Sequence, residues 1–403
     1  MPRTKLPATL KFLALLLLMV GVVTGCKKKD QVVFGVVLPL SGESAIYGTP
    51  IAQGIEIALA DLQKLPDAPE MVLEIVDSEG DPEKGKALLE ELYTNGARAA
   101  IGGVTTPEAL AMVEVADRNN RVLISPSASA RELTGISRNF YRVWPSDSRE
   151  GSKMGQYAAL DLKLETAAIL AADSTYAEGI QSVFAASFQQ NGGEITEMIV
   201  YPKNTDDLTA LVERVVSVKP DGVYIADYAD TVVEIIKLLK EQGFAGRILT
   251  VSAFAAPQAI AAAGGAAEQV FITAPQYAPE ATDNAMIVSF VETYQGKFQE
   301  SPGVYAAHGY DAMLVAYHAM QNGGDRGSNF WKGMRSISEL QGVTGLLQFD
   351  EKGDPTKFPR VYFMTEGKTV DHQRWRKAEM EKIKERLNEI NRERKRILDE
   401  GKS

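Results

Sequence analysis

The sequence is poor in the residues that most enzymes use for covalent or metal chemistry. Its single cysteine, Cys26, cannot form a disulfide within the chain. The three histidines, His308, His318 and His372, show no metal-ligand spacing, and no Gly-x-Ser-x-Gly nucleophile motif occurs. Because none of these chemistries has support, we expect neither an enzyme nor a resident cofactor or metal.

Positive charge is also scarce relative to negative charge. The chain has 43 Lys and Arg against 53 Asp and Glu, a formal net charge of -10. Nucleic-acid recognition requires a basic face, so nucleic acid is excluded as a partner. With 403 residues, of which 45% are apolar and 24% charged, the chain is long enough for two globular domains.

The N-terminus has the pattern of a secretory signal. Positive residues precede an apolar run over 12–23, which is too short for a comfortable membrane-spanning helix. Val23-Thr24-Gly25-Cys26 follows and resembles a bacterial lipobox, in which the cysteine is lipidated and becomes the new N-terminus. The alternative is an ordinary signal peptide with a chance cysteine. We expect a signal peptide over 1–25, a lipidated tether over 26–30, and lipid anchoring in the extracytoplasmic cell envelope.

From residue 31 onward, short apolar strands alternate strictly with amphipathic helices. Gln31–Leu38 is a fully apolar strand, and Thr49-Pro50 has the pattern of a cap and first residue of the following helix. The alternation repeats to about residue 272, which predicts an α/β fold with doubly wound parallel sheets covered on both faces.

The number of elements predicts two lobes joined by three hinge crossings. We expect lobe 1 to contain residues 31–146 and 275–338, and lobe 2 to contain 147–274 and 339–370. Helices over 282–297 and 304–322 need a sheet to pack on. They are assigned to lobe 1 because the sheet of lobe 2 already has enough helices to cover it. A β-hairpin centred on 350–354 would return to lobe 2. A cleft between hinged lobes follows from this arrangement.

The last segment, 371–403, is predicted to be a charged helix with 11 Lys and Arg against 8 Asp and Glu. An apolar residue recurs in it at steps of three, four, three and seven, at Met380, Ile383, Leu387, Ile390 and Ile397. This spacing forms a narrow coiled-coil seam, interrupted by Arg394. Self-association, packing of the seam on the protein's own body, and binding to anionic lipid all remain open.

Four loops at strand ends or helix starts carry small, hydroxyl or aromatic residues: Ser41–Tyr47, Thr105-Thr106, Ser127–Ser129 and Thr175-Tyr176. Open α/β sheets bind small ligands at the carboxyl ends of their strands. Thr106 precedes Pro107 at the start of a helix, where backbone N–H groups could face a carboxylate. Equally, Thr106 could merely cap this helix.

The order of these motifs resembles the type I periplasmic binding proteins of ABC importers, in the Leu/Ile/Val-binding and amide-binding group. The segments that carry the resemblance run from about Val33 to Val370: Gly35-Val36-Val37-Leu38-Pro39-Leu40-Ser41-Gly42 with Tyr47-Gly48, Ile101-Gly102-Gly103 with Thr105-Thr106, Ile124-Ser125-Pro126-Ser127-Ala128-Ser129 with Glu132-Leu133-Thr134, Tyr176 with Gly179, and Phe349-Asp350-Glu351-Lys352-Gly353-Asp354.

The resemblance implies a set of ligand contacts. The hydroxyls of Thr106 and Ser129, with Thr105 beside them, match the positions that hold the ligand's α-carboxylate, and the Ser127 carbonyl matches the position that meets its ammonium. Aromatic walls match Tyr47, Tyr176 and Tyr228. The region that usually supplies a lobe-2 carboxylate, Thr250–Ala255, contains no acid here, so Asp227 is the candidate replacement, or else a solvated loop residue.

The function implied is that of an extracytoplasmic solute-binding lipoprotein. It would capture an amino acid, amide or small carboxylate by hinge closure and deliver it to an ABC permease, without covalent chemistry. The alternative is a ligand-sensing or cell-envelope regulatory lipoprotein with the same fold and no role in transport.

Overall fold

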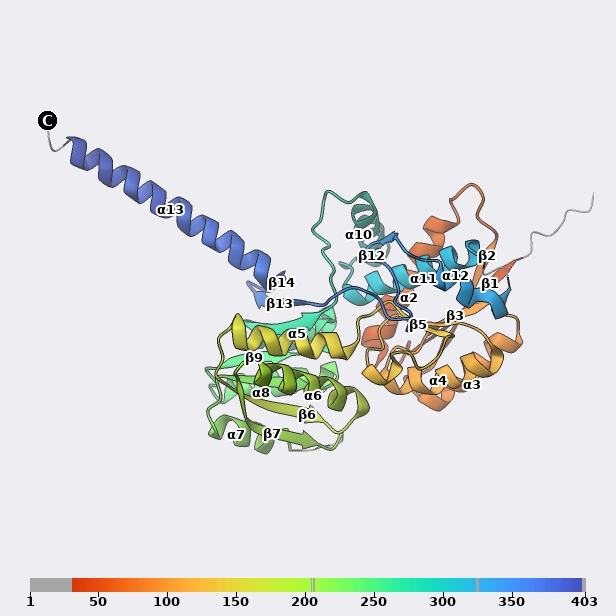
Figure 1. The fold of residues 1–403 in the computed structure, drawn as a ribbon, viewed down its shortest axis with the longest axis horizontal. Coiled ribbons are helices and arrows are strands. Elements are labelled where there is room, and N and C mark those ends of the chain that lie inside the picture. Colours follow the sequence, from red (N-terminus) through yellow and green to blue (C-terminus); the bar gives the residue numbers. More distant parts are fainter. Residues whose placement is uncertain (1–30, 204, 206, 324–325, 401–403) are drawn as a thin grey trace, which may run out of the picture.

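The computed structural model describes residues 31–203, 205, 207–323 and 326–400. The proposed signal peptide and Cys26 lie outside these residues. Two sheets, one parallel and one mostly parallel, lie at opposite ends of the body with helices on both faces (Figure 1), which confirms the predicted α/β fold class.

The first sheet has five parallel strands in the order β2-β1-β3-β4-β5. Its strands are β1 (Val32–Leu38), β2 (Met71–Asp77), β3 (Ala99–Gly102), β4 (Leu123–Ser125) and β5 (Phe140–Arg142). The helices of this part are α2 (Ala45–Leu62), α3 (Pro82–Thr94), α4 (Thr106–Asn119), α10 (Ala285–Phe298), α11 (Val304–Gln321) and α12 (Phe330–Arg335), with the 3₁₀ turns η1 (Arg131–Leu133) and η4 (Gly327–Asn329).

The second sheet has seven strands in the order β14-β13-β10-β9-β8-β6-β7. Its parallel strands are β6 (Thr166–Ala172), β7 (Glu194–Tyr201), β8 (Gly222–Ala226), β9 (Arg247–Thr250) and β10 (Val270–Ala274). Its helices are α5 (Asp147–Leu160), α6 (Thr175–Gln190), α7 (Leu208–Ser217), α8 (Ala229–Glu241) and α9 (Pro257–Ala263), with η2 (Ser252–Ala255) and η3 (Gly264–Ala267). The antiparallel strands β13 (Arg360–Thr365) and β14 (Lys368–Asp371) extend one edge.

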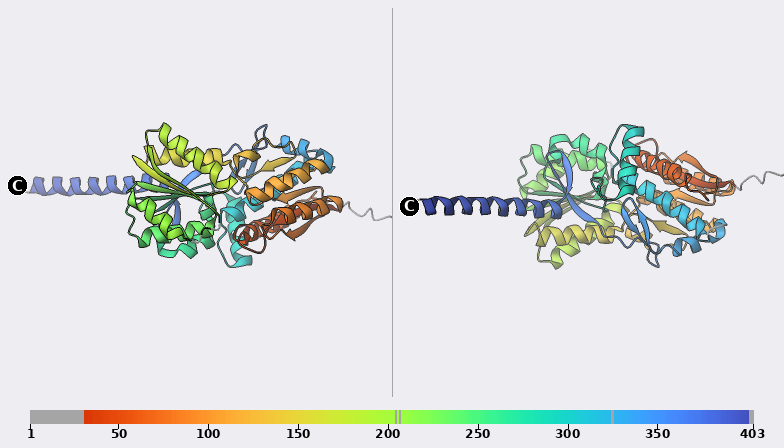
Figure 2. Two further views of the ribbon diagram at one scale, coloured as in Figure 1. Left: turned by 90° about the horizontal axis from the view of Figure 1, so that it is seen from below. Right: turned by 90° about the horizontal axis from the view of Figure 1, so that it is seen from above.

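The chain passes between the two sheets after β5, after β10 and before β13 (Figure 2). Helices α10 and α11 pack on α2, beside the first sheet. A separate two-stranded sheet, β11 (Leu340–Gly342) with β12 (Gly345–Leu347), also lies beside α11, because the Asp311 carboxylate accepts hydrogen bonds from the backbone of Val343 and Thr344. The assignment of residue ranges to two lobes stays a prediction.

Two local predictions were wrong. Helix α2 begins at Ala45 rather than at Thr49-Pro50, so Pro50 lies inside the helix, where it has no N–H to donate to the Ile46 carbonyl. Residues 350–354 form a turn closed by a single bridge between Phe349 and Pro355. The hairpin that joins the second sheet is instead formed by β13 and β14.

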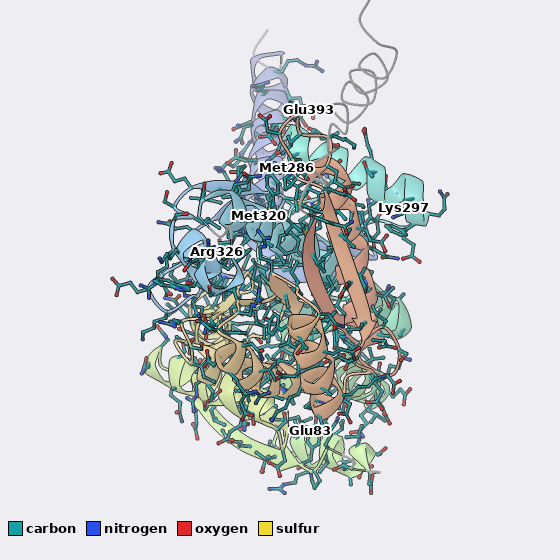
Figure 3. The ribbon with its side chains drawn as sticks, turned by 90° about the vertical axis from the view of Figure 1, so that its right-hand side faces the viewer. Glu83, Met286, Lys297, Met320, Arg326 and Glu393 are labelled. Carbon is teal, nitrogen blue, oxygen red and sulfur yellow. The ribbon has the colours of Figure 1, made fainter. Side chains whose placement is uncertain are left out.

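Helix α13 (His372–Glu400) follows β14 and extends far beyond the body (Figures 1 and 2). Its first turn is fixed to the second sheet, where the rings of His372 and Trp375 lie 4.8 and 4.9 Å from that of Phe363. In Figure 3, Met320 lies inside the packed body, whereas Glu393 lies on the projecting helix α13.

Candidate functional site

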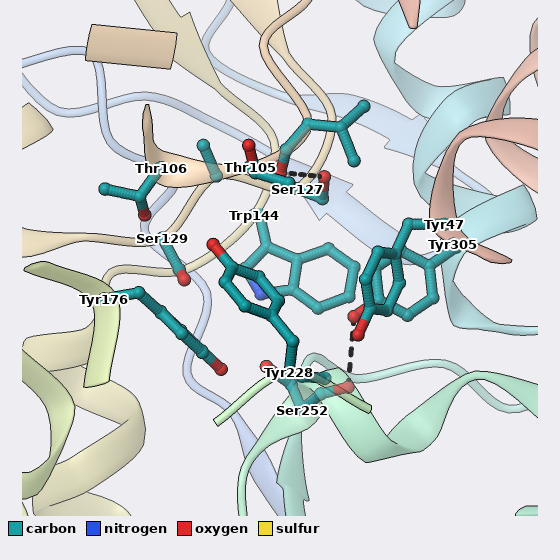
Figure 4. A pocket seen from close by; sticks show the side chains of 13 residues that line it. Tyr47, Thr105, Thr106, Ser127, Ser129, Trp144, Tyr176, Tyr228, Ser252 and Tyr305 are labelled. Atoms are coloured by element: carbon teal, nitrogen blue, oxygen red, sulfur yellow. Dashed lines mark hydrogen bonds between the residues drawn. The ribbon is translucent and has the colours of Figure 1, made fainter. Parts of the chain in front are cut away.

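A small cavity lies between the carboxyl ends of the strands of the two sheets, where the connecting loops meet (Figure 4). From the first sheet's side come the loops after β3 and β4, together with the first residues of α2 and α11. The second sheet's side contributes the starts of α6 and α8 and the turn η2. The cavity is lined by Tyr47, Val104, Thr105, Thr106, Ser127, Ala128, Ser129, Trp144, Tyr176, Tyr228, Ser252, Ala253 and Tyr305.

Aromatic rings form most of the wall. Trp144 stacks on Tyr305 with ring centres 4.8 Å apart, and Tyr47 lies 4.9 Å from Tyr305. The buried ring of His308 lies 4.6 Å from Trp144, and His308 is itself held by the Val304 carbonyl. Burial lowers the pKa of His308 to about 3, so its ring is neutral at physiological pH. The neutral ring therefore supports Trp144 without placing a charge beside the cavity.

A second aromatic pair faces the first. Tyr176 and Tyr228 stack with ring centres 5.1 Å apart, and Tyr228 points into the cavity toward Thr106 (Figure 4). Burial raises the pKa of Tyr228, and the nearby backbone N–H of Thr106 partly opposes that effect. The phenol therefore occupies the space in front of the N-terminus of α4.

Two hydrogen bonds hold the two sides of the cavity together. The Tyr47 hydroxyl of α2 accepts from the Ala229 backbone N–H at 2.9 Å, and the Tyr305 hydroxyl of α11 donates to the Ser252 carbonyl at 3.1 Å. The free volume left between the rings is about 30 Å³, room for only a few water molecules. This conformation is a closed one, and a solute of amino-acid size requires it to open or rearrange.

The hydroxyl residues of the first sheet's loops divide into two groups. The Thr105 hydroxyl donates to Glu108 at 2.9 Å, and the Ser127 hydroxyl donates to the Val104 carbonyl at 2.8 Å. These two protons are used to fix the loops. The hydroxyls of Thr106 and Ser129 point into the cavity (Figure 4), beside the N-terminus of α4, where the helix dipole favours a negative group.

Two buried carboxyls lie behind the cavity at the start of α5. Glu150 accepts hydrogen bonds from the Ser252 backbone N–H at 2.6 Å and from the Ser252 hydroxyl at 2.8 Å, which fixes η2 against the helix. Neither carboxylate oxygen of Asp147 has a hydrogen-bond partner among the described residues, although the Ser129 hydroxyl lies near enough to lower its pKa in part. Burial raises the pKa of both groups.

Seven of the residues predicted from the sequence line the cavity: Tyr47, Thr105, Thr106, Ser127, Ser129, Tyr176 and Tyr228. Asp227 does not. Its carboxylate accepts from the Tyr201 hydroxyl at 3.0 Å and from the Tyr228 backbone N–H at 2.7 Å, and it borders a neighbouring hollow instead. Asp227 therefore orients Tyr228 rather than facing a ligand directly.

Sequence reasoning missed Tyr305, Ser252 and the two buried carboxyls of α5. Tyr305 lies in the first turn of a helix that was assigned to the first sheet, but no local pattern placed it at the cavity. The carboxyl pair gave no signal, since acids in the first turn of a helix are common in solvent. Within the described ranges, no group of side chains has a metal-ligand arrangement, and no helix there is long and apolar enough to cross a bilayer.

The chain was compared with known proteins. A family model described as "Periplasmic binding protein" matches residues 31–368. A leucine-, isoleucine-, valine-, threonine- and alanine-binding protein of Pseudomonas aeruginosa is 23% identical over 334 residues, covering 82% of this chain and 88% of the relative. The Leu/Ile/Val-binding protein homolog 3 of Brucella melitensis is 24% identical, with 80% and 88% covered.

Solved structures show the same arrangement. The leucine-binding protein LivK of Thermotoga maritima has a TM-score of 0.79 at 25% identity, covering 84% of this chain and 97% of that one. LivJ of Streptococcus pneumoniae, in complex with isoleucine, has 0.78 at 22%, covering 84% and 98%. A solute-binding protein of R. palustris, in complex with benzoate, has 0.76 at 22%, covering 85% and 95%.

Proposed function

Because the chain belongs to the periplasmic binding protein family, in its type I branched-chain amino acid group, we propose that it captures a small carboxylate-bearing solute for an ABC importer. The observation that carries this proposal is the closed cavity between the sheets. Its wall combines two hydroxyls at a helix N-terminus with aromatic rings from both sides. Such a combination of an apolar enclosure and a few convergent polar groups is typical of small-molecule sites.

The carboxylate end of the solute binds at the start of α4, where it displaces the Tyr228 phenol. The Thr106 and Ser129 hydroxyls donate to it, and the dipole of α4 favours its negative charge. Asp147 and Glu150 stay behind the wall, where their raised pKa values limit repulsion of an anion. The remaining wall is aromatic, which suits an aliphatic or aromatic body. Similar proteins have been solved in complex with isoleucine and with benzoate.

Capture proceeds by hinge closure. A solute first contacts one side of the open cleft, and the contacts that it gains on the other side shift the equilibrium toward the closed form. The hydrogen bonds between Tyr47 and Ala229 and between Tyr305 and Ser252 exist only in the closed state, because each joins the two sides of the cleft. The closed form then docks on a membrane permease.

A lipid anchor keeps the protein near its permease. The anchor is Cys26, a few residues before β1, and the protein is extracytoplasmic. β1 begins at the end of the body opposite to α13 (Figure 1). The start of β1, to which the proposed tether is joined, therefore lies on the side away from the projecting helix.

The test is a melting-temperature screen with leucine, isoleucine, benzoate and related small carboxylates, followed by calorimetric titration of the compounds that bind. Thr106→Ala and Ser129→Ala are each expected to weaken binding at least tenfold, because a hydrogen bond to a charged group contributes about 1.5–3 kcal/mol. Ser217→Ala is the matched control, since its exposed hydroxyl bonds only the Arg214 carbonyl. Unchanged affinity in both cavity variants would exclude this site.

A further inference from the structure

The projecting part of α13 has an apolar seam that the body leaves uncovered. Its five apolar residues are each more than half exposed, from 52% to 59%: Met380, Ile383, Leu387, Ile390 and Ile397. Packing of this seam on the protein's own body, left open by the sequence, is therefore wrong. The last ion pair between the helix and the second sheet's part of the body is formed by Arg376 and Asp161, at 3.2 Å.

The spacing of the seam determines what can cover it. Met380, Ile383, Leu387 and Ile390 alternate steps of three and four, and Ile397 continues the same heptad register. Side chains at such a and d positions fill the holes of a facing helix with the same 3.5-residue repeat. A helix that packs on a globular surface or on a sheet has a broader apolar stripe than this one. The surface that fits the narrow seam of α13 is therefore another helix with the same repeat.

We propose that α13 associates with α13 of a second copy of this chain as a parallel coiled coil. In a parallel arrangement a g residue meets the e residue of the next heptad of the partner. Glu379 occupies such a g position and Lys384 the matching e position. Two opposite-charge contacts therefore flank the apolar seam, one on each side.

The direction of the helix supports the same orientation. α13 leaves the end of the body opposite to β1 (Figure 1). Copies that stand on one membrane through the N-terminal anchor proposed above project their helices in the same direction, away from the lipid. The helix is also nearly balanced in charge, with 11 cations against 8 anions over 371–403, which is a poor match to an anionic membrane.

Arg394 occupies an a position and faces its counterpart in the parallel coil. Its long stem covers apolar surface while the guanidinium leaves the seam toward water. A single polar residue at an a position lowers stability but fixes the register and number of helices. The seam is therefore short and specific, and the association is concentration-dependent rather than permanent.

The first test measures the molar mass of the mature chain with Cys26→Ser by light scattering over a range of concentrations. We expect at least twice the monomer mass at high concentration. The double variant Leu387→Asn with Ile390→Asn is expected to give the monomer mass at every concentration. The control, Glu385→Asn with Arg392→Asn, changes the opposite face of the same turns and is expected to keep the wild-type mass. A monomeric wild type, or equal masses for both double variants, would overturn the proposal.

The second test determines the orientation. Arg394→Cys, in the chain with Cys26→Ser, is expected to cross-link two copies on mild oxidation, because position 394 faces itself only in the parallel coil. Glu385→Cys on the outer face is the control and stays monomeric on denaturing gels. Failure of Arg394→Cys to cross-link above this control would refute the parallel arrangement.

Solute binding serves as an independent readout. The Leu387→Asn and Ile390→Asn variant leaves the cavity untouched, so its affinity for any compound found in the screen should equal that of the wild type. Loss of association with intact binding separates this proposal from the proposed function, and each can fail without the other.

Discussion

At the residue scale, a buried ion pair fixes the third crossing of the chain to the first sheet. Arg142 on β5 is fully buried and donates to both carboxylate oxygens of Asp354, at 2.7 and 2.9 Å. It also donates to the Ala130 carbonyl at 2.8 Å and to the Thr134 hydroxyl at 2.6 Å. One guanidinium therefore joins the β4–β5 loop to the segment that leads back to the second sheet.

Arg142→Ala is expected to lower the free energy of unfolding by about 3–5 kcal/mol, because it leaves the Asp354 carboxylate buried without its cation. Urea denaturation followed by circular dichroism measures this change. Arg214→Ala is the control, since Arg214 pairs with Glu197 at 2.6 Å but has a side chain that is 60% exposed. The control should cost less than about 1 kcal/mol. Similar losses in the two variants would contradict the structural role of Arg142.

Glu150 should make stability depend on pH. Burial, reinforced by Asp147, raises its pKa above the usual 4.5, so the folded protein keeps a proton that the unfolded chain releases. The free energy of unfolding therefore falls as the pH rises from about 4.5 through the raised pKa. Glu150→Gln cannot titrate and should reduce this fall in a urea denaturation series. Glu194→Gln on an exposed strand end is the control, and a pH dependence unchanged by Glu150→Gln would be evidence against the effect.

Residues of the site were predictable where a motif placed them at the end of a strand. Ser129 lies in such a loop, and Thr106 and Tyr176 lie in the first turns of the helices that follow such loops, so local sequence determines these positions. Asp227 does not line the cavity, because its carboxylate accepts hydrogen bonds from the Tyr201 hydroxyl of β7, two strands away in the sheet, and from the Tyr228 backbone N–H. Tyr305 reaches the site through long-range packing, which a single sequence does not encode in any local pattern.

At the element scale, the contact between α2 and α11 brings two of the aromatic walls together. A side chain at Gly54 would meet the Ala306 carbonyl oxygen at 1.9 Å, and one at Gly309 would meet the Ile51 carbonyl oxygen at 2.2 Å. The two helices can therefore approach closely only with glycine at both positions. Their separation in turn sets that of Tyr47 and Tyr305.

Gly54→Ala is expected to destabilise the fold by about 1–3 kcal/mol, because the added methyl group forces the helices apart. Thermal and urea denaturation measure the loss. Gly296→Ala in α10 is the matched control: nothing lies within 4 Å of its added methyl group, and replacing a helical glycine there should be neutral or stabilise by up to about 1 kcal/mol. Equal behaviour of the two variants would argue against the close contact.

Helices and strands with strong periodicity were predictable from the sequence. The strands at the edges of the sheets and the first residues of helices were not. The apolar run before Leu38 and the alternation of strands and helices lead directly to two parallel sheets. The short strand β5 and the antiparallel pair β13–β14 depend on the sheet edges that receive them. The start of α2 was misjudged because Thr49-Pro50 resembles a cap, while the turn at Gly42–Ser44 lets the helix begin earlier.

At the scale of the whole molecule, the two sheets and the three crossings define a hinge with one closed cavity at its centre. β1, which follows the proposed tether, and α13 lie at opposite ends of the body (Figure 2). The proposed solute capture would depend on relative movement of the two sheets, whereas the proposed self-association would depend on a helix outside both. These two properties are therefore expected to vary independently.

The central claim is that a small carboxylate draws the two halves of the molecule together. Small-angle X-ray scattering of the Leu387→Asn and Ile390→Asn variant, which removes the association of α13, measures this directly. The radius of gyration should decrease when the protein is saturated with the carboxylate that raises its melting temperature most. An unchanged radius of gyration at saturation would contradict capture by hinge closure.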